Sequence, residues 1–294
     1  MANLYVFHQG AGNSGELWYS VFDGTNWARD TRVQNVGMSG SPSALFSVEP
    51  RPGIYVFHQG IRDSGELWYL YFDPRGIATD RPDTKIQNLG MSASPSAVDW
   101  PGLGGISVFH QDFGQHGQLW YTYSRDGTNW GPDTRVQNVG MSASPSAVQW
   151  RGGFTVFHQD FGEHGQLWYT YSPDGTKWGP DTRVQNVGMS ESPSAIVYSG
   201  KLYVFHQDVG AHGQLWYSVF DGANWAPDTR VQNVGMSGSP SAVPWQGGIT
   251  VFHQGFGNNG ELWYTYSRDG INWGPDTPVQ NVGISGSPSA VVYP

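Results

Sequence analysis

Val6-Phe7-His8-Gln9 is the first of six copies of one tetrapeptide in this chain. The other copies begin at residues 56, 108, 156, 204 and 251, so that successive copies start 47 to 52 residues apart. Self-similarity with a period of about 40 to 50 residues is typical of repeat architectures. The 294 residues are therefore interpreted as six copies of one repeat. We expect a single domain over residues 1–294 rather than the two domains that length alone would suggest.

Each repeat contains four segments with the composition of β-strands. In one copy these segments are 144–150, 154–159, 166–171 and 182–186, all rich in β-branched and aromatic residues. The turn Asp174-Gly175 lies between the third and fourth segments and is a strong hairpin signal. Four strands per repeat are typical of a propeller blade. The sequence therefore predicts an all-β fold, a six-bladed β-propeller with four-stranded antiparallel blades.

The two ends of the chain predict how the ring closes. Residues 4–9 have the pattern of a second strand and residues 287–293 that of a first strand, so we expect the N- and C-terminal strands to share one blade. Such closure removes the open sheet edges that promote aggregation. An open array or a pair of three-repeat domains is the alternative, but no Pro/Ser-rich linker interrupts the period.

Composition excludes several classes of function. The formal net charge is −9 and the 15 Lys and Arg residues are scattered, which argues against nucleic acid and anionic membranes as partners. The absence of cysteine excludes disulfides and thiolate metal sites. No run of 18 apolar residues and no signal-peptide pattern occurs, so we expect no membrane insertion and a chain that is cytoplasmic or released without a classical signal. The oligomeric state stays open.

Polar residues gather in two of the four connections of each repeat. Because neighbouring strands run in opposite directions, the loop from second to third strand and the loop from fourth to first strand open on the same face of the ring. Residues 110–118 form the first of these loops in one repeat, and residues 138–144 form the second. Convergent donors and acceptors beside aromatic residues make this face the expected binding face.

The six copies of the first loop fall into two types, which predicts two classes of ligand-binding site with three members each. One type combines Asp with His and Gln and the other has Glu, and a Trp follows in the third strand of both. The expected ligand-binding residues are Asp112, His116, Gln118, Trp120, Asp160, His164, Gln166, Trp168, Asp208, His212, Gln214 and Trp216 in the first type, and Glu16, Trp18, Glu66, Trp68, Glu261 and Trp263 in the second. Paired Asp and His substitutions suggest that these two side chains touch each other or one ligand. Neutral differences copied by recent duplication are the alternative.

Several recurring residues have a structural interpretation beside the functional one. The invariant His-Gln pair could be buried between blades, where polar groups need hydrogen-bond partners. The third-strand Trp residues could belong to the core. The Ser-x-Asp-Gly-x-x-Trp turns, such as Ser172 to Trp178, resemble a shortened Asp-box, in which Asp binds its own backbone. The spacing of His110, Asp112 and His116 matches no metal-ligand signature, so we expect no metal.

The Ser-Pro-Ser-Ala-Val, Val-Phe, Leu-Trp-Tyr and Asp-Gly-x-x-Trp motifs, repeated in blades of about 48 residues, resemble those of bacterial and fungal propeller lectins. The likeness is to the Photorhabdus-type fucose-binding lectins and, more loosely, to the tectonins, and it extends over every repeat. The resemblance implies multivalent glycan binding in pockets between blades, with fucose or O-methylated sugars as leading ligands. The chain departs from the Photorhabdus type in having six repeats rather than seven and in its His-Gln-Asp-x-Gly-x-His loops.

The repetition itself argues against an enzyme. Glycoside hydrolysis needs two carboxylates in different environments, whereas here the acids recur at equivalent positions and the arginines recur as Arg32, Arg135, Arg183 and Arg230. We therefore expect a lectin without catalytic residues or cofactor, whose partners are cell-surface or free saccharides. A protein-interaction scaffold, engineered or consensus-derived, is the alternative. Near-identical loops favour a repeated small ligand.

Overall fold

The structure is a computed structural model that describes residues 2–49, 51–74, 82–100, 104–114, 116–162, 165–210, 213–257 and 260–294. Every regular element in these ranges is a β-strand, and the sheets are antiparallel, so the prediction of an all-β chain with four-stranded antiparallel sheets is confirmed. In the same ranges no helix has the length and apolar character to cross a membrane.

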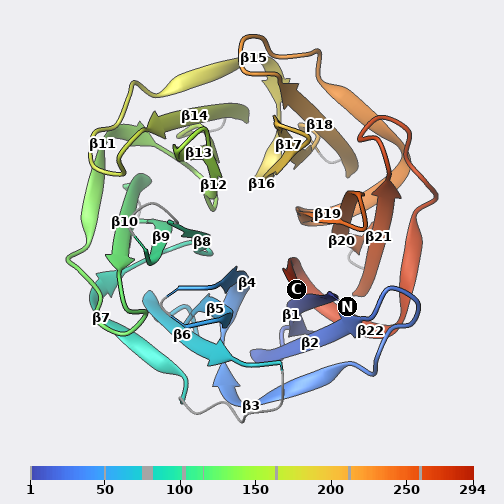
Figure 1. Cartoon of the computed structure of the whole chain (residues 1–294), viewed down its shortest axis with the longest axis horizontal. Coiled ribbons are helices and arrows are strands. Elements are labelled where there is room, and N and C mark those ends of the chain that lie inside the picture. The colour runs from blue at the N-terminus through green and yellow to red at the C-terminus, as the bar shows by residue number, and fades with distance from the viewer. Residues whose placement is uncertain are drawn as a thin grey trace.

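The strands form successive four-stranded groups, which we call blades and number I to VI (Figure 1). Blade I contains the end of β22 (Thr277–Tyr293), β1 (Asn3–Gly10), β2 (Glu16–Phe22) and β3 (Thr31–Gly37). Blade II contains β4 (Ser39–Ser47), β5 (Gly53–Gln59), β6 (Glu66–Phe72) and β7 (Thr84–Gly90). Blade III contains β8 (Ser96–Asp99), β9 (Ile106–Gln111), β10 (Gln118–Ser124) and β11 (Thr134–Gly140).

The remaining blades follow the same order. Blade IV contains β12 (Ser146–Trp150), β13 (Gly153–Gln159), β14 (Gln166–Ser172) and β15 (Thr182–Gly188). Blade V contains β16 (Ser190–Tyr198), β17 (Lys201–Gln207), β18 (Gln214–Phe220) and the start of β19 (Thr229–Trp245). Blade VI contains the end of β19, β20 (Gly248–Gly255), β21 (Glu261–Ser267) and the start of β22.

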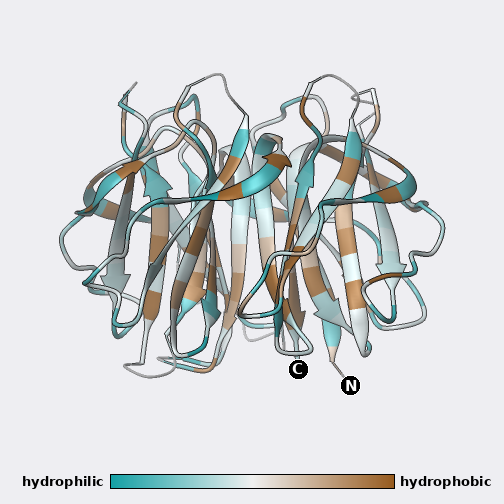
Figure 2. Cartoon of the chain, turned by 90° about the horizontal axis from the view of Figure 1, so that it is seen from above, coloured by the Kyte–Doolittle hydropathy of each residue, from teal (hydrophilic) through white to brown (hydrophobic). Residues whose placement is uncertain are grey.

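Strands β19 and β22 are each 17 residues long and belong to two blades, as the outer strand of one and the inner strand of the next. Strand β22 pairs with β1 from Asn3 opposite Tyr293 to Gly10 opposite Ile284. The two ends of the chain therefore share a blade, and both lie on one face of the ring (Figure 2). The connections from second to third strand lie on the opposite face, because each second strand runs away from the termini.

The hydrophobic core lies between neighbouring blades rather than inside one blade. Phe57 and Tyr69 of blade II pack with Ile106 and Val108 of blade III in one cluster of buried residues. The ring of Trp130, which follows the third strand of blade III, meets Phe57 edge-on with centroids 5.5 Å apart. Aromatic pairs of this geometry stabilise a core beyond the apolar area that they bury. Each blade is thus fixed by its neighbours on both sides.

Two rings of hydrogen bonds join the inner strands. In the first ring the backbone N–H of one serine donates to the Oγ of the equivalent serine of the next blade at 2.9 Å, in the order Ser41, Ser94, Ser144, Ser192, Ser239, Ser287 and back to Ser41. In the second ring an alanine N–H in each blade donates at 2.8 to 2.9 Å to a serine of the preceding blade; the acceptors are Ser43, Ser96, Ser146, Ser194, Ser241 and Ser289. The serines of the Ser-x-Ser-Pro-Ser motif therefore close the ring.

The invariant histidines are buried, which supports the structural interpretation of the His-Gln pair. His110 is fully buried, its Nε2 lies 3.0 Å from Asp133 Oδ1, and its Nδ1 lies 3.0 Å from the carbonyl oxygen of Gln111. The same contacts recur in the other blades, where the histidine and aspartate are His8 and Asp30, His58 and Asp83, His158 and Asp181, His206 and Asp228, and His253 and Asp276. These aspartates come directly before the fourth strand and position it against the second.

Candidate functional site

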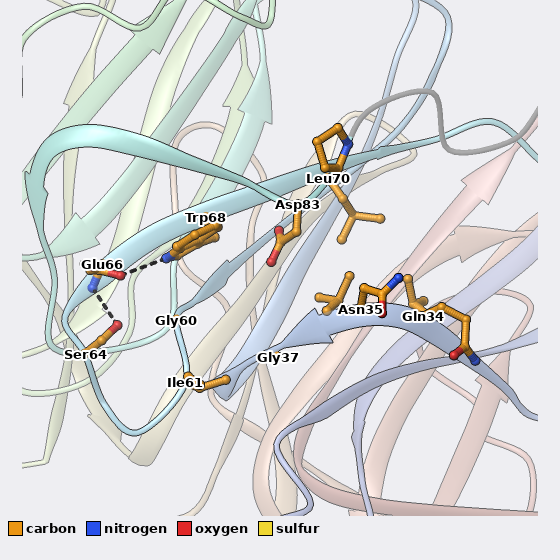
Figure 3. A pocket seen from close by; sticks show the side chains of 13 residues that line it. Gln34, Asn35, Gly37, Gly60, Ile61, Ser64, Glu66, Trp68, Leu70 and Asp83 are labelled. Atoms are coloured by element: carbon orange, nitrogen blue, oxygen red, sulfur yellow. Dashed lines mark hydrogen bonds between the residues drawn. The ribbon is translucent and has the colours of Figure 1, made fainter.

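Pockets recur between neighbouring blades, where the outer strand of one blade faces residues of the next, and two of them include residues of the connection from second to third strand. The pocket between blades I and II has a volume of about 650 Å³ and lies between β3 and the segment from Gly60 to Leu70 (Figure 3). The pocket between blades VI and I has a similar lining and measures about 770 Å³. The pocket between blades II and III measures about 750 Å³ and is lined by β7, Trp120 and residues 128–133, without Asp112, His116 or Gln118. All three are large enough for a monosaccharide, and each is lined by a Trp of the third strand.

Blades I, II and VI carry Glu16, Glu66 and Glu261 and are called the Glu-type blades. In blade II one carboxylate binds both an indole N–H and a cation. Glu66 Oε2 accepts a hydrogen bond from Trp68 Nε1 at 3.1 Å, and Glu66 Oε1 lies 2.5 Å from Lys85 Nζ (Figure 3 shows the first of these contacts). These two hydrogen bonds, the Lys85 bond first, hold the pKa of the Glu66 carboxyl below its usual range. The pocket therefore carries an ionised carboxylate in a fixed orientation.

Blades I and VI repeat this arrangement with one difference. In blade I, Glu16 bonds Trp18 Nε1 at 3.2 Å and Arg32 at 3.1 Å. In blade VI, Glu261 accepts from Trp263 at 3.2 Å, but Pro278 stands opposite Trp263, where blades I and II have Arg32 and Lys85. The predicted Glu and Trp residues of the second class are therefore neighbours in all three blades.

Blades III, IV and V lack this carboxylate, because Gln118, Gln166 and Gln214 take the place of the glutamates. We call them the Gln-type blades. Within the described part of the chain, the buried Nε1 atoms of Trp120, Trp168 and Trp216 have no hydrogen-bond partner. The same holds for the buried Nε atoms of Arg135 and Arg230. The indole donor that Glu satisfies in one class is thus open in the other, where the Nε atoms of two facing arginines are open as well.

The Cβ atom of the residue after His-Gln explains why the loops come in two types. A Cβ placed on Gly60 would lie 2.9 Å from Trp68 Nε1 and 2.6 Å from Ser64 Oγ, and a Cβ on Gly10 would lie 2.8 Å from Trp18 Nε1. The indole can therefore reach its glutamate only when the residue after His-Gln is glycine. Asp112, Asp160 and Asp208 occupy that position in the other class, so Asp and the Glu–Trp bond exclude each other sterically.

Asp112 organises its own loop. Its Oδ1 accepts the backbone N–H of Gln118 at 2.7 Å, and its Oδ2 lies 3.2 Å from Nδ1 of His116, whose side chain is 74% exposed. Asp160 and Asp208 accept the backbone N–H of Gln166 and Gln214 in the same way. The predicted contact between the Asp and His side chains is thus observed for Asp112 and His116. The predicted residues His164 and His212 lie outside the described residues.

The position after the Gly or Asp just described is apolar in every repeat, a feature not predicted from the sequence; Ala11 and Ile61 line the pockets of blades I and II there. Phe113, Phe161 and Phe256 are 62%, 56% and 58% exposed, and Ile61 and Val209 are 50% and 51% exposed. The Phe113 ring lies directly over Gly65 of the preceding blade. These side chains fill a fixed position in every repeat, which is the signal that could have found them.

The Asn and Asp residues of two other motifs have backbone roles. Asn35, Asn88, Asn138, Asn186, Asn233 and Asn281 all have φ between 59° and 61°, the left-handed region that Asn tolerates, and four of them line pockets. In the turn of blade IV, Asp174 accepts the backbone N–H groups of Thr176 and Lys177. The interpretation of the Asp-box-like turns as structural is thus supported. In the described ranges no group of three His, Asp or Glu side chains is placed to hold a metal.

Several solved structures have a similar architecture. The chain superposes on the Aleuria aurantia lectin in complex with Fucα1-6GlcNAc with a TM-score of 0.68, 15% identity and coverage of 97% of this chain and 94% of that one. For the BP39L lectin from Burkholderia pseudomallei the TM-score is 0.65 at 15% identity, with 96% and 95% coverage. The chain has the fold of the β-propeller lectins. For AofleA from Arthrobotrys oligospora the TM-score is 0.65 at 13% identity, with 99% and 92% coverage.

The resemblance seen in the repeated motifs is thereby confirmed at the level of the fold. No protein-family model matches the sequence, and no curated protein matches it.

Proposed function

We propose that residues 1–294 form one six-bladed propeller domain that acts as a multivalent lectin for neutral saccharides. The observation that carries this proposal is the recurrence of pockets between neighbouring blades, three of which hold a third-strand indole beside polar groups. A sugar would place its apolar C–H face on the Trp or the apolar loop residue, and its hydroxyls would bond to the carboxylate, amide and cation. Weak sites repeated on one rigid face gain avidity of about 10²-fold or more on a glycan-coated surface.

Fucose and O-methylated sugars are the first ligands to test. The Aleuria aurantia lectin was solved with Fucα1-6GlcNAc and the SapL1 lectin with α-methyl fucoside. Pockets of 650 to 770 Å³ that hold a third-strand indole beside carboxylates suit a single neutral sugar ring better than an extended protein surface. A chain without catalytic activity is supported by the recurrence of the same carboxylates from blade to blade and by their engagement in internal bonds, Glu66 with Trp68 and Lys85 and Asp83 with His58.

Calorimetry with methyl α-L-fucoside and an O-methylated fucoside, in the presence of a chelator, tests the proposal. We expect several equivalent sites per chain, and Trp68→Ala should lower the number of sites by about one. Lys201→Ala is the matched control, because this exposed residue begins β17 on the opposite face. Silence of the wild-type chain across a glycan array would favour a protein-interaction scaffold instead.

A further inference from the structure

Three of the blades have lost the glutamate carboxylate that the other three carry beside the third-strand indole. In blades I and II, the two oxygens of Glu16 and Glu66 divide between an indole N–H and a cation on the neighbouring strand. In blades III, IV and V the residue at this position is Gln118, Gln166 or Gln214. The pairing of the third-strand Trp with a cationic residue of the fourth strand is the same in blades I, II, III and V.

The open donors of the Gln-type blades face each other. Trp120 on β10 is the register partner of Arg135 on β11, and Trp216 on β18 is the partner of Arg230 on β19. Directly opposite residues have Cβ atoms about 5 Å apart on one face of the sheet. Trp120 Nε1 and Arg135 Nε, and likewise Trp216 Nε1 and Arg230 Nε, are buried and without a partner among the described residues. In blade IV, Trp168 Nε1 repeats the first of these open donors.

The glutamine cannot replace the glutamate. A side-chain amide has one acceptor oxygen, and its NH₂ group only donates. A single amide oxygen would have to accept from both donors at once, and in the described part of the chain neither the indole Nε1 nor the facing guanidinium Nε has a partner. Because an unpaired buried donor costs about 1–3 kcal/mol, a ligand that brings two acceptor sites gains what the Glu-type blades gain internally. The flexible Gln side chain must move aside for such a ligand, since both nitrogens are shielded.

We infer that the pockets of blades III, IV and V bind a saccharide that carries an sp² oxygen, either the carbonyl of an acetamido group or a carboxylate. This oxygen takes the place of the missing glutamate carboxylate between the indole and the guanidinium. The Glu-type pockets already hold that carboxylate and take an unsubstituted sugar. The inference rests on the proposed lectin function and divides it into two ligand classes.

The charge around the Gln-type pocket bears on the two sources of this oxygen. Asp112 keeps one carboxylate close by, with Oδ1 committed to the Gln118 N–H and Oδ2 to His116. It repels a carboxylate ligand and leaves a neutral carbonyl unaffected, whereas Arg135 favours the carboxylate. N-acetylglucosamine and glucuronic acid therefore serve as separate probes, and methyl α-L-fucoside serves as the unsubstituted reference.

The test compares the wild-type chain with Gln118→Glu/Gln166→Glu/Gln214→Glu by calorimetry. We expect affinity for N-acetylglucosamine or glucuronic acid to fall at least tenfold, because each new carboxylate occupies the arginine side of the ligand oxygen's place even where Asp keeps it from the indole, while methyl fucoside binding persists. If affinity falls for only one of the two sugars, the oxygen of that sugar is the group that binds between the indole and the guanidinium. In a second variant series, Asp112→Gly/Gln118→Glu reproduces the pair present as Gly60 and Glu66, which restores room for the indole and keeps the test valid if the triple variant is unstable.

Two outcomes overturn the inference. Methyl fucoside binding in all pockets with no binding of either substituted sugar would do so and would leave the lectin proposal intact. Equal affinity of a substituted sugar for the wild-type chain and both variants would also contradict it. Failure of all three sugars to bind would instead overturn the proposed function itself.

Discussion

At the scale of single residues, the indole and the glycine below it decide the type of pocket. Gly60→Ala would place a methyl group 2.6 Å from Ser64 Oγ and 2.9 Å from Trp68 Nε1. The indole must then leave Glu66, so we expect a loss of about 1–3 kcal/mol in the free energy of unfolding, as is usual for overpacking. The number of sugar sites should fall by about one. Urea denaturation and calorimetry on the same sample measure both effects.

A suitable control is Gly200→Asn. Gly200 has φ +74°, a conformation that Asn tolerates, and nothing lies within 4 Å of a Cβ at this position. This variant should keep its stability and all its sites. Unchanged binding and stability of Gly60→Ala would show that the contact between glycine and indole does not determine the pocket.

The recurring motifs revealed which residues matter at this scale, but not always why. Repetition of His-Gln did not distinguish burial from ligand contact, and burial of His110 against Asp133 follows from packing between distant segments. The partner Asp recurs before Thr in every repeat and could have been noticed. The Asp after His-Gln always occurs together with the Gln that replaces Glu. The reason is that the Asp side chain excludes the indole position in which Trp bonds Glu, and sequence spacing does not reveal this.

At the scale of the element, the stability of the turn between the third and fourth strands of blade IV depends on the charge of its aspartate. The backbone N–H of Lys177, then that of Thr176, donates to Asp174 and lowers the pKa of its carboxyl from 3.8 to about 2. Because the pKa is lower in the folded state, the turn adds stability above pH of about 4, and this contribution disappears as pH falls towards 2. The urea midpoint of Asp174→Ala should thus lie below that of the wild type at pH 6 and converge with it near pH 2.

Asp174→Asn separates charge from geometry. The amide oxygen can still accept the two backbone N–H groups, so this variant should fall between the other two and should show no titration of the turn from pH 4 to 2. A constant difference between wild type and Asp174→Ala over this range would contradict a role for the ionised carboxylate.

The strands were largely predictable from the sequence, because alternating aromatic and β-branched residues bounded by Gly and Asp carry their own signal. The fourth strand of blade IV extends to Gly188, two residues beyond the predicted 186. The additional residues lie beyond Asn186, whose φ is +61°. A left-handed residue inside a strand is a local irregularity that composition does not announce. The two double-length strands β19 and β22 were likewise not foreseen.

At the scale of the molecule, the hydrogen-bond rings make every blade boundary equivalent. The serine bond from the C-terminal strand of blade I to blade II, from Ser287 N–H to Ser41 Oγ, has the same 2.9 Å length as the bond from Ser94 N–H to Ser144 Oγ. A closed ring of equal contacts has no natural beginning. The position of the chain ends should therefore have little effect on stability, provided that a blade is still completed by strands from both ends.

A circular permutant tests this equivalence. Asn3 and Tyr293 are register partners, so a short linker can join the old termini, and new termini can be opened at Gly200 in the exposed turn between β16 and β17. Blade V is then closed as blade I is now, with its inner strand from the new C-terminus. We expect the melting temperature to stay within about 4 °C of the original and the number of sugar sites to be unchanged. A permutant opened at Gly175 leaves β15 as a lone outer strand at one end and should be less stable, because that strand alone would have to close its blade. Similar losses in both permutants would mean that the present terminal seam is special, and the ring could not be treated as a set of interchangeable blades.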